Sequence, residues 1–156
     1  MQQQAAITEV PLGKSAWRST ATPLGRPFHK MLVSFSAAYF VGALVTDLVY
    51  WQMPDVMWER FSIWLIVAGL VLAGFAVVAF LIDLASGSQI ERPASPSLVG
   101  YALAVVLSLV NAFVHSRDGY TAIVPAGLTL SGLVIVVLLV TARVGAALAN
   151  RTRVGE

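Results

Sequence analysis

The sequence predicts an all-α membrane protein in which four transmembrane helices form an up-down antiparallel bundle. The chain has 156 residues, of which 58% are hydrophobic and only 12% are charged, whereas soluble domains carry roughly 25% charged residues. Four long apolar segments follow one another with short connections between them. Each segment approaches or exceeds the roughly 20 residues with which a helix crosses a bilayer, and each is too long for a membrane β-strand.

The elements follow in order along the chain. Residues 1–30 are polar and contain glycine and proline without a sustained period, so we expect a disordered tail there. The four spans are expected at about 31–51, 61–84, 98–116 and 121–148, and a short basic tail at 149–156. Short connections make consecutive helices antiparallel neighbours, which favours the up-down topology.

The positive charges predict the orientation. With four spans, both termini and the second connection lie on one side, which holds eight of the ten lysines and arginines. These eight are Lys14, Arg18, Arg26, Lys30, Arg92, Arg143, Arg151 and Arg153. The positive-inside rule therefore places both termini in the cytoplasm, in a bacterial inner membrane. The net charge of +2 indicates orientation and contact with anionic lipid, and we expect no nucleic-acid partner.

Small and polar residues mark the helix faces that we expect to pack. Small residues recur four positions apart in each span: Ala38 and Gly42, Gly69 and Ala73, Gly100 and Ala104, and Gly127 and Ser131. A polar stripe through Tyr101, Ser108, Asn111 and His115 follows one face of the third span. Lipid disfavours such a stripe, so it is expected inside the bundle. Similar faces predict contact with other membrane proteins or self-association.

Few ionisable groups lie within the spans, and they form two candidate clusters. Asp47, Asn111 and His115 are expected near the outer membrane face, and His29 and Asp83 near the inner face. Ionisable residues inside a membrane are functional candidates, and histidine changes charge near neutral pH, so one interpretation is a proton-handling or ligand site. The other interpretation is that these side chains satisfy one another and hold the bundle together, which is the more common role of buried polar groups.

No cofactor, metal or catalytic site is predicted. The chain has no cysteine and only two histidines, which removes thiolate sites and leaves too few convergent ligands for zinc. The expected topology puts the two histidines at opposite membrane faces, so one haem cannot use both. A haem with one histidine, or one shared between protomers, stays open as an alternative. No G-x-S-x-G motif occurs, and we expect no enzymatic activity.

Four short stretches of the chain form a recognisable set: His29, Leu32, Val33 and Phe35, then Asp47 and Leu48, Ile82 to Leu84, and Arg153 to Gly155. Together they resemble a bacterial family of predicted membrane proteins, domain of unknown function 2231. The resemblance implies four spans and an occasional association with electron-transfer proteins. Two family prolines are replaced by Lys30 and Ser36, and Ser34 and Ser97 stand where the family often has histidine. If the family uses those histidines for a cofactor, this chain lacks most of them.

Three functional hypotheses follow. The first is a non-catalytic accessory or anchoring subunit of a membrane complex, suggested by the small-residue faces. The second is a haem-linked or quinone-linked electron-transfer component acting through the outer cluster. The third is transport of a small solute or of protons by an oligomer, since four spans alone give a thin pathway.

Overall fold

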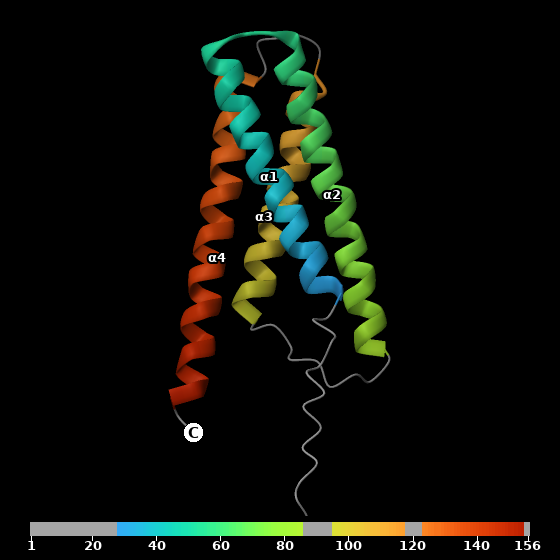
Figure 1. Ribbon diagram of the computed structural model, residues 1–156, viewed down its shortest axis with the longest axis vertical. Helices are drawn as coiled ribbons and strands as arrows, with labels where there is room; N and C mark the ends of the chain where they lie inside the picture. The colour runs from blue at the N-terminus through green and yellow to red at the C-terminus, as the bar shows by residue number, and fades with distance from the viewer. Residues whose placement is uncertain (1–27, 86–94, 118–122, 155–156) are drawn as a thin grey trace, which may run out of the picture.

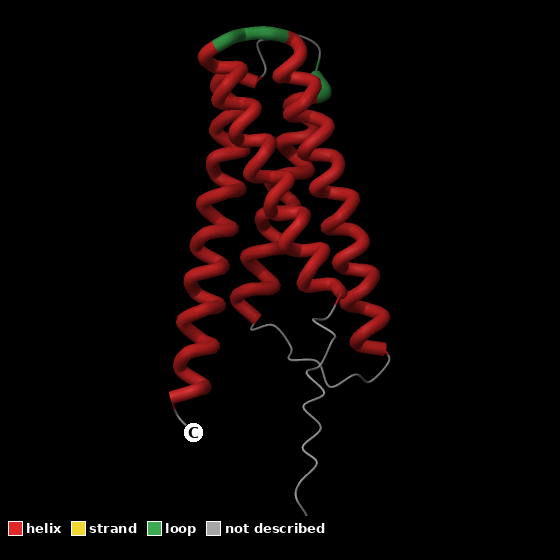
Figure 2. The backbone as a smooth tube through the Cα atoms, in the orientation of Figure 1, coloured by secondary structure: helices red, strands yellow, loops and turns green. Residues whose placement is uncertain are grey.

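The computed structural model describes residues 28–85, 95–117 and 123–154, and within them it contains helices and no strand (Figures 1 and 2). The helices are α1 (Phe28–Gln52), α2 (Val56–Ala85), α3 (Ser95–His115), a π-helical turn (Ile123–Gly127) and α4 (Leu128–Val154). All four long helices are apolar and long enough to cross a membrane. The expected all-α class with four membrane-capable helices is confirmed. Most of the expected amino-terminal tail and parts of two connections lie outside the described residues.

The helices extend beyond the apolar segments of the sequence. The helix α1 begins at Phe28 inside the expected tail, and α4 continues to Val154 rather than ending near 148. The second helix begins at Val56, five residues before the expected start. The carboxylate of Asp55 accepts a hydrogen bond from the backbone N–H of Met57 at 2.9 Å, which caps this helix. A hydropathy window marks only the part that lipid surrounds, whereas backbone hydrogen bonding continues through the polar ends.

A proline sets the boundary between α1 and α2. The residue before a proline is disfavoured in the helical conformation, and α1 ends at Gln52, just before Met53 and Pro54. The short connection that follows lies at one end of the molecule, which we call the loop end (Figure 1). The described chain begins with Phe28 at the opposite end, which we call the tail end.

Helix pairs pack closely at positions where glycine removes a side chain. A β-carbon at Gly69 would lie 2.7 Å from the ring of Phe40, so α1 and α2 are in contact at this point. The hydroxyl of Ser36 also donates to the carbonyl of Gly69 at 2.9 Å. A β-carbon at Gly100 would similarly meet the side chain of Thr141, which brings α3 against α4. Small residues therefore serve as close contacts between helices, as membrane packing requires.

The expected packing faces are found in most spans. Ala73, Ala104 and Ser131 are buried, and so are most members of the polar stripe on α3. Ala38 is exposed, so it does not serve as a contact between helices within the described chain. A small residue can face lipid at little cost, so size alone does not identify a contact.

Packing is uneven among the helices. In its most apolar window, α1 has 33% of its residues buried inside the molecule, whereas α4 has 6%. The helices also spread apart towards the tail end, where α4 and α2 lie on opposite sides of the molecule (Figure 1). Much of α4 therefore faces its surroundings rather than the other three helices.

Candidate functional site

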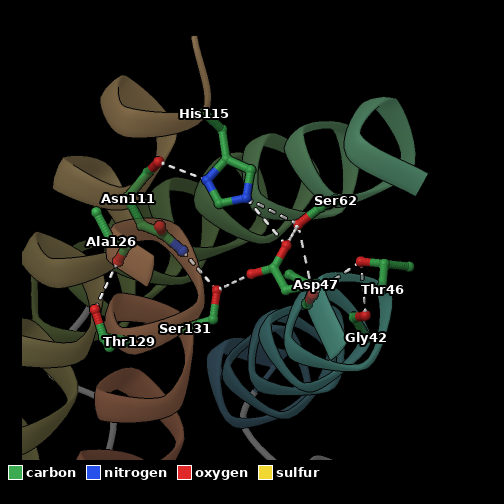
Figure 3. Close-up of polar contacts among 10 residues, drawn as sticks. Gly42, Thr46, Asp47, Ser62, Asn111, His115, Ala126, Thr129 and Ser131 are labelled. Atoms are coloured by element: carbon green, nitrogen blue, oxygen red, sulfur yellow. Dashed lines mark hydrogen bonds and ion pairs between the residues drawn. The ribbon is translucent and has the colours of Figure 1, made fainter. Parts of the chain in front are cut away.

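A cluster of polar side chains joins all four helices near the loop end (Figure 3). Its members, which we call the Asp47 cluster, are Asp47 of α1, Ser62 of α2, Asn111 and His115 of α3, and Ser131 of α4. Each is buried, and the exposed fraction of Asp47 and of Ser62 is 0%. Most polar groups in such surroundings are hydrogen-bonded to one another, because neither lipid nor water can satisfy them.

The carboxylate of Asp47 is the centre of this cluster. Its Oδ1 accepts a hydrogen bond from the Ser62 hydroxyl and lies 3.0 Å from Nε2 of His115. Its Oδ2 accepts a hydrogen bond from the Ser131 hydroxyl at 2.5 Å. One side chain from α1 thus contacts a polar side chain from each of the other three helices (Figure 3).

The position of His115 determines where its protons can lie. Its Nδ1 lies 3.0 Å from the backbone carbonyl of Asn111, which can only accept a hydrogen bond, so Nδ1 carries a proton. A second proton lies between Nε2 and Oδ1 of Asp47, on one atom or the other. The pair is either imidazolium with carboxylate or neutral imidazole with carboxylic acid. Its net charge is zero in both cases, which suits a site away from water.

The side chain of Asn111 extends the cluster to α4. Its Nδ2 donates to the Ser131 hydroxyl at 2.7 Å, and that hydroxyl in turn donates to Asp47. The Oδ1 of Asn111 has no hydrogen-bond partner within the described chain. The amide therefore fixes the direction of the Ser131 hydroxyl while one of its own acceptors stays unsatisfied.

A close backbone approach holds the imidazole in place. A β-carbon at Gly127, in the turn before α4, would lie 2.7 Å from Cε1 of His115. Only glycine leaves room for the ring here without a shift of either element. Gly127 was expected to lie on a packing face, and the structure shows that its neighbour is His115.

Two members of the cluster, Ser62 and Ser131, were not among the candidate site residues from the sequence. Serines in membrane helices commonly bond to their own backbone, as Ser108 does to the carbonyl of Ala104 at 2.8 Å. Nothing in the local sequence distinguishes Ser62 from a serine that bonds only to its own backbone. Ser131 carried a weak signal, because it lies four residues after Gly127 on an expected packing face.

The second candidate pair lies at the tail end. Nδ1 of His29 lies 2.9 Å from Oδ2 of Asp83, and the side chain of Asp83 is 30% exposed. The ring of His29 also contacts the edge of Phe80, with centroids 5.4 Å apart. His29 and Asp47 are 18 positions apart on α1, which corresponds to about 27 Å of helix. The two candidate clusters are therefore separate sites at opposite ends of the molecule.

The geometry of the Asp47 cluster does not match a nucleophilic triad. In such a triad the carboxylate and the hydroxyl contact different nitrogens of the imidazole. Here Asp47 and Ser62 both lie at Nε2 of His115, and Nδ1 faces a backbone carbonyl. Because both ring nitrogens have partners, His115 also has no nitrogen free for a haem iron in this arrangement. The described residues contain no group of three or more metal-ligating acidic or histidine side chains.

Comparison with known proteins identifies a family. Residues 25–156 match the family model described as predicted membrane protein (DUF2231). This match covers all four helices and agrees with the resemblance found in the sequence. No curated protein and no solved structure gives a significant match. The chain therefore belongs to the DUF2231 family of predicted membrane proteins.

Proposed function

We propose that this member of the DUF2231 family is a non-catalytic accessory or anchoring subunit, whose exposed helix faces bind the helices of a partner membrane protein. The observation that carries the proposal is the complete burial of Asp47, which bonds to side chains of all three other helices. Both carboxylate oxygens of Asp47 have hydrogen-bond partners inside the bundle, where the group is not accessible to a substrate. The bundle is thus internally fixed, and its outer faces are what it offers to other molecules.

The outer face of α4 is the best candidate for partner contact. Only 6% of its most apolar window is buried inside the molecule, although the helix is long enough to span a membrane. A β-carbon at Gly132 would meet no atom of the described residues within 4 Å, so packing within that part of the chain does not require a glycine here. A helix that approached this face would find large apolar side chains, Leu133, Val136, Leu139 and Val140, around a small residue.

The proposed topology is an up-down bundle in a bacterial inner membrane with both termini in the cytoplasm. The orientation is supported by the positive charges, because eight of the ten lysines and arginines lie on the side that holds both termini. The natural absence of cysteine makes the topology directly testable. In intact cells, a membrane-impermeant maleimide should label Asp55→Cys at the loop end and leave Arg151→Cys unlabelled. If only Arg151→Cys were labelled, the termini would lie outside the cytoplasm and the proposed orientation would be wrong.

Site-specific cross-linking tests the accessory role. A photo-reactive amino acid at Val136, on the exposed face of α4, should give a discrete protein adduct in native membranes. The same residue at Phe113, exposed on α3, serves as the matched control and should give mainly lipid adducts. If Val136 gives no protein adduct, and the detergent-solubilised chain is strictly monomeric and retains no partner, the accessory role is wrong.

A haem-linked electron-transfer role is the second candidate function. It is less well supported, because haem needs an imidazole nitrogen that is free to bind iron and His115 in the Asp47 cluster does not offer one. An absorption spectrum of the purified protein, oxidised and then reduced with dithionite, separates the two. A Soret band with sharpened bands on reduction, in protein made with ample haem, would favour the redox role and direct mutagenesis to His29 and His115.

A further inference from the structure

An arginine lies on the exposed side of α4, within the part of this helix that can cross a membrane. Arg143 belongs to the membrane-capable segment Val124–Arg151 and lies eight positions before its end, which corresponds to about 12 Å of helix. A β-carbon at Gly145 would meet the hydroxyl of Ser97, so Arg143 is close to the level of the first turns of α3. The side chain of Arg143 is exposed.

No acidic side chain of the described residues pairs with Arg143. The two aspartates of the spans, Asp47 and Asp83, contact histidines instead. Ionisable side chains in membrane spans usually face the bundle interior and pair with one another. Arg143 does neither within the described chain. The acceptors for its guanidinium must therefore come from another molecule.

Arg143 shares one narrow stripe of α4 with Gly132. Successive residues of a helix are turned by about 100°, so positions 132, 136, 139 and 143 point in nearly the same direction. We call Gly132, Val136, Leu139 and Arg143 the α4 stripe. Val136 and Leu139 are more than half exposed. The glycine would normally cost about 1 kcal/mol relative to alanine inside a helix, and packing among the described residues does not require it.

We propose that the partner helix on this face carries an aspartate or glutamate that forms an ion pair with Arg143. The inference rests on the proposed partner-binding role of α4 and names the chemistry of that partner. The helix would approach closely at Gly132, and its carboxylate would lie about 16 Å farther towards the tail end. The planar guanidinium can donate two parallel hydrogen bonds to one carboxylate. This pair would select one partner helix among many apolar ones.

Two other occupants explain the α4 stripe less well. In a parallel two-fold dimer through this stripe, the two copies of Arg143 would lie at the same depth beside each other, and like charges in contact disfavour association. A lipid phosphate would account for Arg143 but not for Gly132, because lipid tails adapt to any side chain. A helix with a carboxylate accounts for both residues.

The photo-reactive residue at Val136 provides the first test. Arg143→Gln should lower the yield of the protein adduct at least about tenfold, because loss of one member of a desolvated charge pair leaves the other without compensation. Arg143→Lys keeps the charge and should restore part of the yield. The matched control Arg151→Gln removes an exposed positive charge two turns farther along α4 and should leave the yield unchanged. Yields are normalised to the amount of each variant in the membrane.

A zero-length cross-link identifies the acceptor as a carboxylate. A membrane-permeant carbodiimide joins an amine to a carboxylic acid as an amide and takes up the water to become a urea, whereas a guanidinium does not couple. Arg143→Lys should therefore give a covalent product with the partner protein. Val144→Lys, one position on and about 100° around the helix, is the matched control and should not. The unmodified chain, with Lys14 and Lys30, gives the background.

The outcomes separate this inference from the accessory role. If the unmodified chain gives no protein adduct at Val136, the accessory role is wrong and the ion pair with it. If the adduct forms and Arg143→Gln leaves its yield unchanged, only the ion pair is wrong. Equal coupling of Arg143→Lys and Val144→Lys, or no protein product from either, would also overturn the ion pair. A product of lipid mass alone from Arg143→Lys would assign Arg143 to a lipid phosphate instead.

Discussion

Each end of this molecule contains an aspartate paired with a histidine, but the two pairs lie in different surroundings. At the loop end, Asp47 is fully buried and bonds to side chains from three other helices. At the tail end, Asp83 pairs with His29, and its side chain stays 30% exposed. Both ends contain an aspartate 2.9–3.0 Å from a histidine. The same pair therefore lies in different surroundings at the two ends, fully buried with further partners at the loop end and partly exposed at the tail end.

The largest effect should come from Asp47→Ala, which removes the shared partner of His115, Ser62 and Ser131. Breaking a buried pair by removing one member typically costs about 3–5 kcal/mol, because the groups left behind have no replacement partner. We expect a loss of this order in the free energy of unfolding in detergent. Asp83→Ala is the matched control at the tail end. If both substitutions destabilise the protein equally, the contrast between the two ends does not exist.

The next effect should come from Gly127→Ala. The added β-carbon would lie 2.7 Å from Cε1 of His115, so the ring must move and the contact with Asp47 must lengthen. Overpacking of this kind typically costs about 1–3 kcal/mol. Gly132→Ala, five residues later on α4 and with no described atom within 4 Å of the new β-carbon, should not destabilise the protein. Thermal unfolding of the two variants side by side makes the test, and equal stabilities would contradict the close approach.

A smaller effect is expected for Ser62→Ala, which removes one hydroxyl from the Asp47 cluster. Hydrogen bonds between membrane helices average about 0.6 kcal/mol in measured cases, with a maximum near 1.7. We expect a loss of about 1 kcal/mol, since Asp47 keeps its contacts with His115 and Ser131. In a double-mutant cycle, Ser62→Ala should lose most of its effect when Asp47 is already alanine. Additive effects would show that the hydroxyl acts through another contact.

The smallest effect should be that of Asp83→Asn at the tail end. Its partner His29 keeps a hydrogen-bond acceptor, and the partly exposed pair is screened by its surroundings, so we expect a change below about 1 kcal/mol. The free energy of unfolding of Asp83→Asn should be measured at low and at high salt concentration. A large loss that is insensitive to salt would mean that the tail end is as firmly fixed as the loop end.

Part of the candidate site was accessible from the sequence. Asp47 and His115 stand out because ionisable residues are rare in apolar spans, and helical periodicity places Asn111 on the same face as His115. Their contact with Ser62 and Ser131 was not predictable in this way. Serine is too common in membrane helices to mark a site, and its partner depends on the rotation of each helix about its own axis.

The sequence by itself determined four membrane-capable helices and the two aspartate–histidine candidates, because hydropathy and residue chemistry are local properties. Only the tertiary structure decided that His115 uses both nitrogens inside the bundle, that Gly127 makes room for its ring, and that Ser62 and Ser131 bond to Asp47. These features depend on how far apart the helices lie and how they are rotated. That arrangement results from the packing of all four helices together, which no single segment encodes.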